Sequence, residues 1–158
     1  MPVSTKFHFL LYLLISTLVF VIDQVSKDWV QTYLLLGHSL DISHFFALVH
    51  WHNTGAAFGF LAEAGGWQYY FLSAIAIAVV CVLPYLLYKH HHDRLFCTML
   101  ALILGGALGN VYDRLRLGYV VDFIYFHYQG WYWPAFNVAD SAITLAVILG
   151  IYKGWMER

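Results

Sequence analysis

The sequence predicts an all-α membrane protein, a bundle of four transmembrane helices with a small β-sheet outside the bilayer. Hydrophobic residues make up 61% of the 158 positions and charged residues only 11%, whereas about 25% of the residues in an average globular protein are charged. The apolar residues gather in four runs, each near the roughly 20 residues that a helix needs to cross a bilayer. We therefore expect one integral membrane domain over residues 1–158.

The expected spans lie at about residues 8–27, 67–88, 95–113 and 136–156. No small-residue cleavage site follows the first span and further apolar runs do, so we predict an uncleaved helix rather than a secretory leader. The second span opens on Trp67, Tyr69 and Tyr70, aromatic residues typical of a membrane interface. Because only residues 89–94 join the second span to the third, these two helices should be antiparallel.

Basic residues predict the orientation of the bundle. Five of them fall on one side of a four-span arrangement and three on the other: Lys6, Lys89, Arg94, Lys153 and Arg158 against Lys27, Arg114 and Arg116. Cytoplasmic loops carry the excess of Lys and Arg in membrane proteins, so this distribution predicts that both termini are cytoplasmic. The longer connections, 28–66 and 114–135, then face outward.

The two outward connections contain patterns typical of β-strands. Residues 44–52, HFFALVHWH, would place Phe45, Ala47, Val49 and Trp51 on one face of a strand. Residues 119–126, YVVDFIYF, are too few to span a bilayer and rich in β-branched and aromatic side chains. Asn53-Thr54-Gly55 indicates a turn. We expect a small sheet at the outer membrane surface.

Four aspartates lie in or beside apolar segments: Asp23, Asp113, Asp122 and Asp140. A charged side chain inside a bilayer costs about 2.5–3.5 kcal/mol on insertion scales, so those that persist usually face the bundle interior and serve a function. Asp23 precedes Lys27 by one helical turn, which favours an ion pair that supports the first span. Asp113 has two readings, compensation by the adjacent Arg114 and a direct functional role.

The start of the fourth span carries a polar stripe. Its polar side chains recur with helical spacing, at Asn137, Asp140, Ser141 and Thr144. A hydrogen-bond seam between helices gains little from a carboxylate that an amide would not supply, so Asp140 favours a functional reading. Burial in the apolar segment 120–124 should raise the pKa of Asp122. Two carboxylates in different protonation states would form a general acid–base pair.

Five motifs follow one another along the chain: DQVSK at 23–27, NTGAAFGF at 53–60, GGALGNVYDR at 105–114, VVDFI at 120–124 and FNVADS at 136–141. In order and spacing they resemble the motifs of the lipoprotein signal peptidases, also called signal peptidase II. With the four spans, the resemblance covers nearly the whole chain. It implies a bacterial inner-membrane aspartyl endopeptidase that removes the signal peptide from prolipoproteins, on the N-terminal side of a diacylglyceryl-modified cysteine.

The resemblance also implies roles for individual residues. The catalytic pair would be Asp122 and Asp140, the substrate-binding residues Asn53, Asn110, Arg114 and Asn137, and the residues that support the architecture Asp23, Lys27 and Asp113. The family fold is four transmembrane helices with a periplasmic β-cradle, an α+β part outside the membrane, and a mobile outer helix. The segment 53–66 would contain that mobile part.

The implied partners are the diacylglyceryl-modified prolipoprotein and membrane lipids. The implied state is a monomer with its active site toward the periplasm, and the expected chemistry needs neither a cofactor nor a metal. A net charge of -1 without a cluster of Lys and Arg excludes nucleic acid as a partner. The histidine run at 90–92 lies outside the motifs.

A small transporter or proton-conducting membrane protein is the alternative, because such proteins also keep carboxylates at membrane depth. It predicts acidic residues near the midplane and internal repeats. Asp23, Asp113 and Asp140 instead fall toward the outer ends of their spans, and the sequence contains no such repeat. The sequence therefore favours chemistry at the outer interface.

Overall fold

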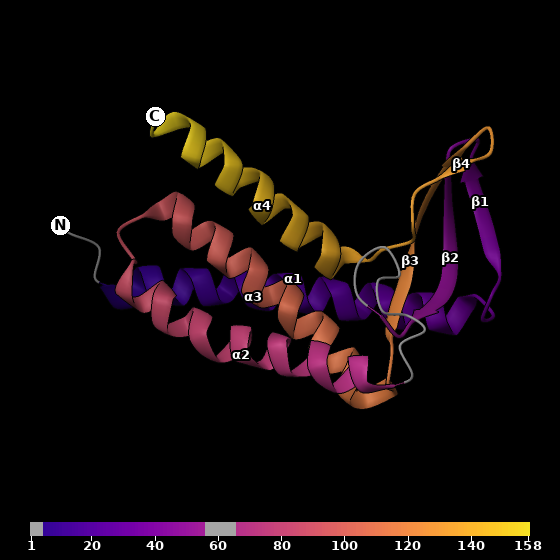
Figure 1. Ribbon diagram of the computed structural model, residues 1–158, viewed down its shortest axis with the longest axis horizontal. Helices are drawn as coiled ribbons and strands as arrows, with labels where there is room; N and C mark the ends of the chain where they lie inside the picture. Colours follow the sequence, from indigo (N-terminus) through magenta and orange to yellow (C-terminus); the bar gives the residue numbers. More distant parts are fainter. Residues whose placement is uncertain (1–4, 56–65) are drawn as a thin grey trace.

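The computed structural model describes residues 5–55 and 66–158, in which four long helices run beside one another and a small sheet stands beyond one end of them (Figure 1). The helices are α1, Thr5–Tyr33; α2, Trp67–Lys89; α3, Arg94–Leu117; and α4, Val138–Met156. All four are long and apolar enough to cross a membrane, as predicted. Residues 56–65, which hold most of the NTGAAFGF motif and of the predicted mobile segment, lie outside the described residues.

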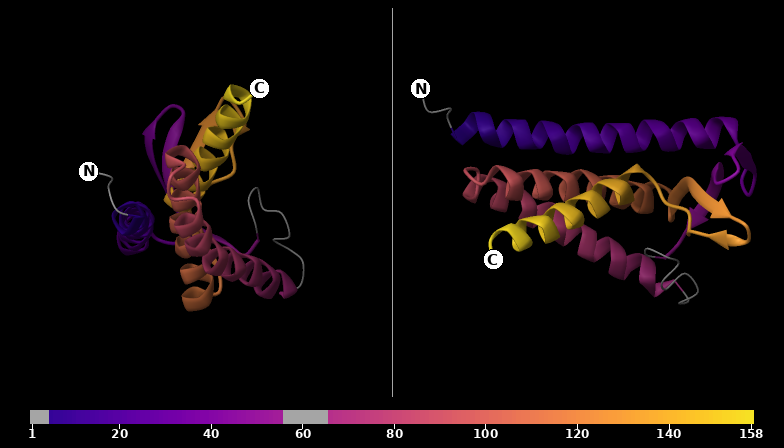
Figure 2. Two further views of the ribbon diagram at one scale, coloured as in Figure 1. Left: turned by 90° about the vertical axis from the view of Figure 1, so that its left-hand side faces the viewer. Right: turned by 90° about the horizontal axis from the view of Figure 1, so that it is seen from above.

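Helix α3 lies at the centre of the bundle. It packs against each of the other three helices, while α2 and α4 diverge on separate sides (Figure 2). In the most apolar 18-residue stretch of α3, 56% of the residues are buried, whereas 17% are buried in the corresponding stretch of each other helix. Those helices turn most of their apolar surface outward, which suits a bilayer because lipid tails are as apolar as leucine.

Glycines let α3 approach its neighbours closely. A Cβ atom added to Gly105 would lie 2.6 Å from the carbonyl oxygen of Ser16 and 2.7 Å from Cβ of Val19, both in α1. A Cβ atom on Gly106 would meet the carbonyl oxygen of Ala139 at the start of α4. Small residues of this kind at helix contacts are what brings backbones together in a membrane.

Two helices extend beyond the expected spans. Helix α1 continues past Lys27 to Tyr33, because residues 28–33 contain no helix breaker and Val30 is buried. Helix α3 ends only at Leu117, where Gly118 adopts a φ of 85° and its N–H donates to the Arg114 carbonyl oxygen at 2.9 Å. The expected outward connections from 28 and from 114 therefore begin as helix, with Lys27 and Arg114 inside helices.

The sheet has four antiparallel strands in the order β1-β2-β3-β4. They are β1, Ser39–Ser43; β2, Phe46–Asn53; β3, Val120–Tyr128; and β4, Trp131–Tyr132. Strands β2 and β3 confirm the two predicted strands. Strands β1 and β4 were not predicted, because both are short edge strands defined by their pairing; the alternation of Leu40 and Ile42 was the available signal for β1.

The start of α4 lies against the sheet. The N–H groups of Phe123 and Ile124 donate to the carbonyl oxygen of Phe136 at 3.0 and 2.8 Å, and the N–H of Phe136 donates back to Ile124 at 3.1 Å. These bonds hold residue 137, the N-cap of α4, beside β3. Asp122 and Asp140 are thereby brought to the border between the helices and the sheet.

We predict that Gly105→Ala lowers the stability of the bundle by about 1–3 kcal/mol, the usual cost of overpacking a close contact. The added methyl group would clash with backbone and Cβ atoms of α1, which cannot rotate away. Thermal unfolding in detergent measures the effect. Gly154→Ala in α4 is the matched control, since among the described residues nothing outside its own stretch of helix lies within 4 Å of its added Cβ. Equal melting temperatures for the two variants would contradict the prediction.

Candidate active site

One lysine ammonium lies between two carboxylates inside the bundle. Lys27 Nζ is 2.7 Å from Asp23 Oδ2 and 2.9 Å from Asp113 Oδ2, and the Lys27 side chain is 1% exposed. The predicted ion pair between Asp23 and Lys27 is therefore formed. Asp113 pairs with Lys27 rather than with Arg114, which corrects one reading of the sequence; adjacent residues on a helix do not face each other.

Further N–H groups donate hydrogen bonds to the carboxylate oxygens of Asp23 and Asp113. Asp23 Oδ1 accepts a hydrogen bond from the N–H of Ala139 at 2.9 Å, and Asp113 Oδ2 accepts one from the N–H of Val121 at 3.2 Å. Gln24 Nε2 donates to Asp113 Oδ1 at 2.9 Å. This charged cluster ties α1 and α3 to the first turn of α4 and to the start of β3.

Asn110 connects the charged cluster to Asp140. Its Oδ1 accepts hydrogen bonds from Lys27 Nζ at 3.2 Å and from Asn137 Nδ2 at 3.3 Å. A side-chain amide has one acceptor end and one donor end, so its NH₂ group is turned toward Asp140, and Nδ2 lies 2.8 Å from Asp140 Oδ1. The ammonium of Lys27 therefore determines which end of Asn110 faces Asp140.

Asn137 bonds both predicted catalytic aspartates. Its Oδ1 accepts from the backbone N–H of Asp140 at 2.9 Å, and its own N–H donates to Asp140 Oδ2 at 3.4 Å. This reciprocal pair is a capping box at the start of α4. With the amide oxygen held in this way, Nδ2 points to β3 and donates to Asp122 Oδ1 at 2.8 Å. One asparagine thus holds two carboxylates from different elements.

Asp122 is 3% exposed, and its second oxygen, Oδ2, accepts a hydrogen bond from Asn53 Nδ2 at 2.9 Å. Burial, and after it the negative charge of Asp140, raises the pKa of Asp122 to about 7, against the lowering effect of the amides of Asn53 and Asn137. The rise expected from the apolar sequence around Asp122 is confirmed in direction and in cause.

Asn53 and Arg114 meet at the backbone of Gly55. The Gly55 N–H donates to Asn53 Oδ1 at 2.9 Å, which forms the turn predicted at 53–55, and its carbonyl oxygen accepts from Arg114 Nη2 at 3.1 Å. Arg114 Nη1 also donates to the Asn110 carbonyl oxygen at 3.4 Å. Within residues 5–55 and 66–158, the buried Nε of Arg114 has no hydrogen-bond partner. All the predicted site residues therefore belong to one connected network.

The two aspartates open into adjoining cavities. The cavity at Asp122, about 480 Å³, lies against the sheet. The cavity at Asp140, about 400 Å³, runs along α4 past Ser141 and Thr144 to the apolar side chains of Leu145 and Ile148. Residues shared by both linings are Asn53, Pro134 and Ala135. A bound chain could therefore run from an apolar groove beside the helices, across both carboxylates, to the sheet.

Sequence reasoning missed several residues around the site. Gln24 bonds Asp113, and its signal was a polar side chain beside Asp23 in an apolar run. Trp51, Tyr125 and Tyr132 line the cavity at Asp122, but aromatic residues on a strand are ordinary and gave no signal. Over residues 5–55 and 66–158, no group of three or more His, Cys, Asp or Glu side chains is arranged to hold a metal ion.

Two aspartates held by amides, at the border between a four-helix membrane bundle and a sheet, form the arrangement expected of a membrane-embedded aspartic protease. The chain belongs to the signal peptidase II family: the family model described as "Signal peptidase (SPase) II" matches residues 15–156. The resemblance drawn from the five motifs is thereby confirmed. Family membership and the four apolar helices make it a multi-pass inner-membrane protein.

Relatives named lipoprotein signal peptidase match most of the chain. That of Burkholderia thailandensis is 52% identical over 138 residues, which cover 87% of this chain and 83% of the relative. That of Paraburkholderia phytofirmans is 49% identical over 135 residues, 85% of this chain and 78% of the relative. Identity at this level over this length shows a shared family.

Solved structures described as bacterial membrane enzymes share the fold. One has a TM-score of 0.83 at 34% identity, and the match covers 92% of this chain and 88% of the chain in the solved structure. A second has a TM-score of 0.77 at 35% identity and covers 90% of each chain. The arrangement of four helices with an antiparallel sheet is therefore that of a membrane enzyme.

We predict that Lys27→Met destabilises the protein by about 3–5 kcal/mol, because removal of the ammonium leaves two buried carboxylates without their charge partner. Chemical or thermal unfolding in detergent measures the loss. Arg116→Met is the matched control: it breaks an exposed ion pair with Asp28 at 3.8 Å, whose expected contribution is about 0–1 kcal/mol. Similar losses in the two variants would mean that the charged cluster does not support the fold.

Proposed function

We propose that the chain is an aspartyl endopeptidase that cleaves the signal peptide from diacylglyceryl-modified prolipoproteins, on the N-terminal side of the lipidated cysteine. Asp122 and Asp140 are the catalytic residues of this proposal. The observation that carries it is the double bonding of Asn137, whose side chain donates to Asp122 while its backbone N–H donates to Asp140. Family membership supports the substrate class.

In the proposed mechanism the two carboxylates share one proton, because two close carboxylates cannot both ionise cheaply. Asp122, whose pKa lies near 7, holds the proton. Asp140, in the first turn of α4 where the helix dipole favours an anion, is ionised and takes a proton from a water molecule. That water attacks the scissile carbonyl, while Asp122 polarises the carbonyl oxygen and then protonates the leaving amine.

The residues predicted to bind substrate divide into two groups. All three asparagines donate side-chain N–H groups to the aspartates. The linings of the two cavities do not include Asn110 or Asn137, so we assign these two to positioning the catalytic carboxylates. Asn53 lines both cavities, and the buried Nε of Arg114 has no hydrogen-bond partner among residues 5–55 and 66–158. These two residues are therefore the ones we assign to binding the substrate backbone. Asp23, Lys27 and Asp113 support the architecture.

The proposed orientation has both termini in the cytoplasm and the sheet in the periplasm. The helix ends nearest both termini lie at the end of the bundle away from the sheet (Figure 1). Lys27 is buried in ion pairs, so it no longer counts among the outward basic residues. Five basic residues against two then support the orientation more strongly than five against three. The active site would face the outer surface of the inner membrane.

A transporter or proton-conducting protein is not favoured, because the relatives and the family model are those of a protease. The monomeric state and the contacts with particular membrane lipids stay predictions. The apolar groove along Leu145 and Ile148 supports an apolar substrate segment at membrane depth, next to Asp140. A lipidated cysteine and an apolar signal peptide require such an apolar groove.

We predict that Asp122→Asn and Asp140→Asn each lower cleavage of a diacylglyceryl-modified prolipoprotein by at least about 100-fold, the lower range for loss of a general acid or base. The assay uses purified protein in liposomes and follows the shortened product. Asp28→Asn, which removes an exposed carboxylate outside the site, is the control and should keep parental cleavage. Full activity in either catalytic variant would remove that residue from the mechanism.

We predict that kcat/KM falls as the pH rises through about 7, because Asp122 must be protonated to donate to the carbonyl oxygen and its pKa lies there. Asn53→Ala removes a hydrogen bond that lowers the pKa of Asp122, so the alkaline limb should move to higher pH. Rates measured from pH 5 to 9 for both proteins test this. A limb that stays in place or moves to lower pH would contradict the assignment.

A further inference from the structure

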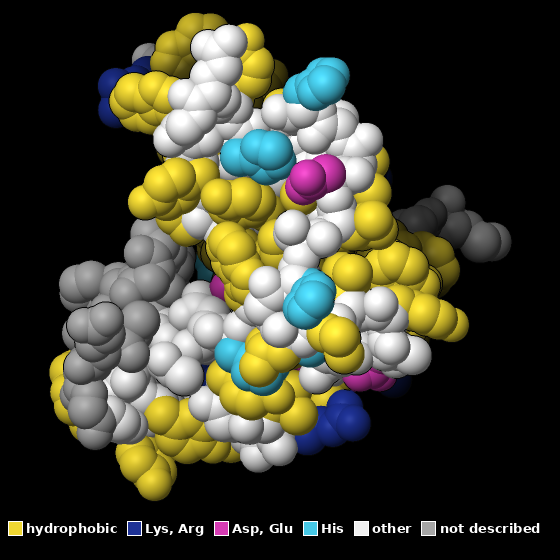
Figure 3. Space-filling model, turned by 90° about the vertical axis from the view of Figure 1, so that its right-hand side faces the viewer, with side chains coloured by type: hydrophobic (Ala, Val, Ile, Leu, Met, Phe, Trp, Pro, Cys, Tyr) yellow, Lys and Arg dark blue, Asp and Glu magenta, His cyan; other side chains and the backbone are white. Residues whose placement is uncertain are grey.

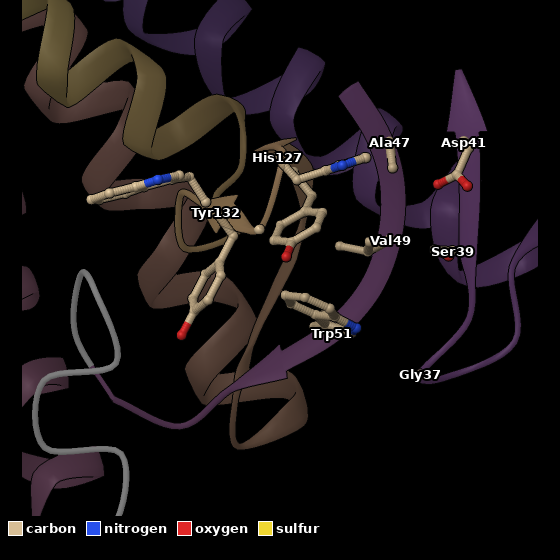
Figure 4. A pocket seen from close by; sticks show the side chains of 11 residues that line it. Gly37, Ser39, Asp41, Ala47, Val49, Trp51, His127 and Tyr132 are labelled. Carbon is tan, nitrogen blue, oxygen red and sulfur yellow. The ribbon is translucent and has the colours of Figure 1, made fainter. Parts of the chain in front are cut away.

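A third hollow lies on the sheet beyond the helices, and neither aspartate lines it. We call it the trough; its volume is about 350 Å³. Figure 4 shows Ala47 and Val49 of β2 at its middle, Asp41 of β1 on one side and Tyr132 on the other. The remaining lining residues are Gly37, Ser39, Trp51, Tyr125, His127, Gly130 and Trp131.

Strand register explains why the trough exists. Asp41 of β1 pairs with Ala47 of β2, and Ala47 pairs with Tyr125 of β3, so the three side chains share one face of the sheet. Neighbouring strands are about 4.8 Å apart, which separates Asp41 from Tyr125 by roughly 10 Å. Between them stands only the methyl group of Ala47. That row therefore leaves room for an incoming side chain.

The trough continues the cavity of Asp122. Trp51, Tyr125 and Tyr132 line both hollows. Trp51 and Tyr125 contact edge to face with ring centroids 4.9 Å apart, and Tyr125 stacks on His127 at 5.5 Å. The two hollows therefore adjoin, and an extended chain that leaves Asp122 along β3 would lead into the trough.

The chemistry of the trough suits a cation. Among residues 5–55 and 66–158, Asp41 forms no ion pair or hydrogen bond through its exposed carboxylate. Aromatic rings on the opposite side attract cations through their faces. The end-on view in Figure 3 shows hydrophobic and histidine side chains interspersed with other side chains and backbone at this end of the molecule, with few charged side chains among them. A Lys or Arg side chain would meet a carboxylate and aromatic rings together.

We propose that the trough binds the part of the substrate that follows the scissile bond and prefers Lys or Arg at about the third or fourth residue after it. Tyr125, which pairs with Ala47 across from Asp41, is three residues beyond Asp122 on β3. Three strand residues span roughly 10 Å, the length of three to four residues of extended peptide. The inference rests on the proposed function and adds a specificity-determining subsite to it. Asp41 is its charged residue.

The test uses three diacylglyceryl-modified prolipoprotein peptides that differ only at the third and fourth residues after the scissile bond, which are both Lys, both Ala or both Glu. We expect kcat/KM for the Lys peptide to exceed that for the Glu peptide on the order of fivefold, the size of partly exposed charge interactions. Asp41→Asn should bring this ratio close to one, and Asp41→Lys should invert it. Asp28→Asn removes a carboxylate away from the trough and should keep the parental ratio.

Inversion of the ratio separates a direct contact from a structural role, since a merely distorted sheet would lower cleavage of all three peptides together. Equal cleavage of the three peptides by the parent would overturn the subsite and leave the proposed function standing. A ratio that persists in Asp41→Asn and Asp41→Lys would also overturn it. Failure of the parent to cleave any of the peptides would overturn the proposed function and this inference with it.

Discussion

The structure depends on holding one lysine ammonium inside a membrane bundle. A buried charge is tolerated only when its partners and their remaining hydrogen bonds are complete. The partners of Lys27, Asp23 and Asp113, are completed by N–H groups from α4 and β3. Because these groups come from different elements, satisfying a single charge fixes α1, α3, the start of α4 and the start of β3 relative to one another.

The charged cluster and the first turn of α4 also position Asp122 and Asp140, because they orient the side-chain amides of Asn110 and Asn137. Lys27 fixes the oxygen of Asn110, and the first turn of α4 fixes the oxygen of Asn137. Each amide then presents its N–H group to a carboxylate, Asn110 to Asp140 and Asn137 to Asp122. Side chains locked in this way lose little freedom when substrate binds, which is what preorganised acid–base chemistry needs.

Several features could be predicted from the sequence because their signals are local. Four apolar runs predict the four helices, alternation in 44–52 predicts β2, and the β-branched and aromatic residues of 119–126 predict β3. The spacing of Asp23 and Lys27 is one helical turn, so their ion pair follows from the helix alone. The apolar neighbours of Asp122 likewise predict that its pKa is raised. The five motifs, read as a set, indicated the family.

The long-range contacts were decided only by the tertiary structure. Lys27 and Asn110 are 83 positions apart in the sequence, and Asn53 and Asp122 are 69 positions apart. At such separations the spacing along the chain does not predict the distance between two residues in space. The pairing of Asp113 with Lys27 rather than Arg114, and the meeting of Asp122 with Asp140 through Asn137, follow from how the helices pack at glycines and how the sheet docks on α4. The sequence determined which residues carry charge and hydrogen-bonding groups; the packed fold determined which of them meet, because only a folded chain sets distances between distant segments.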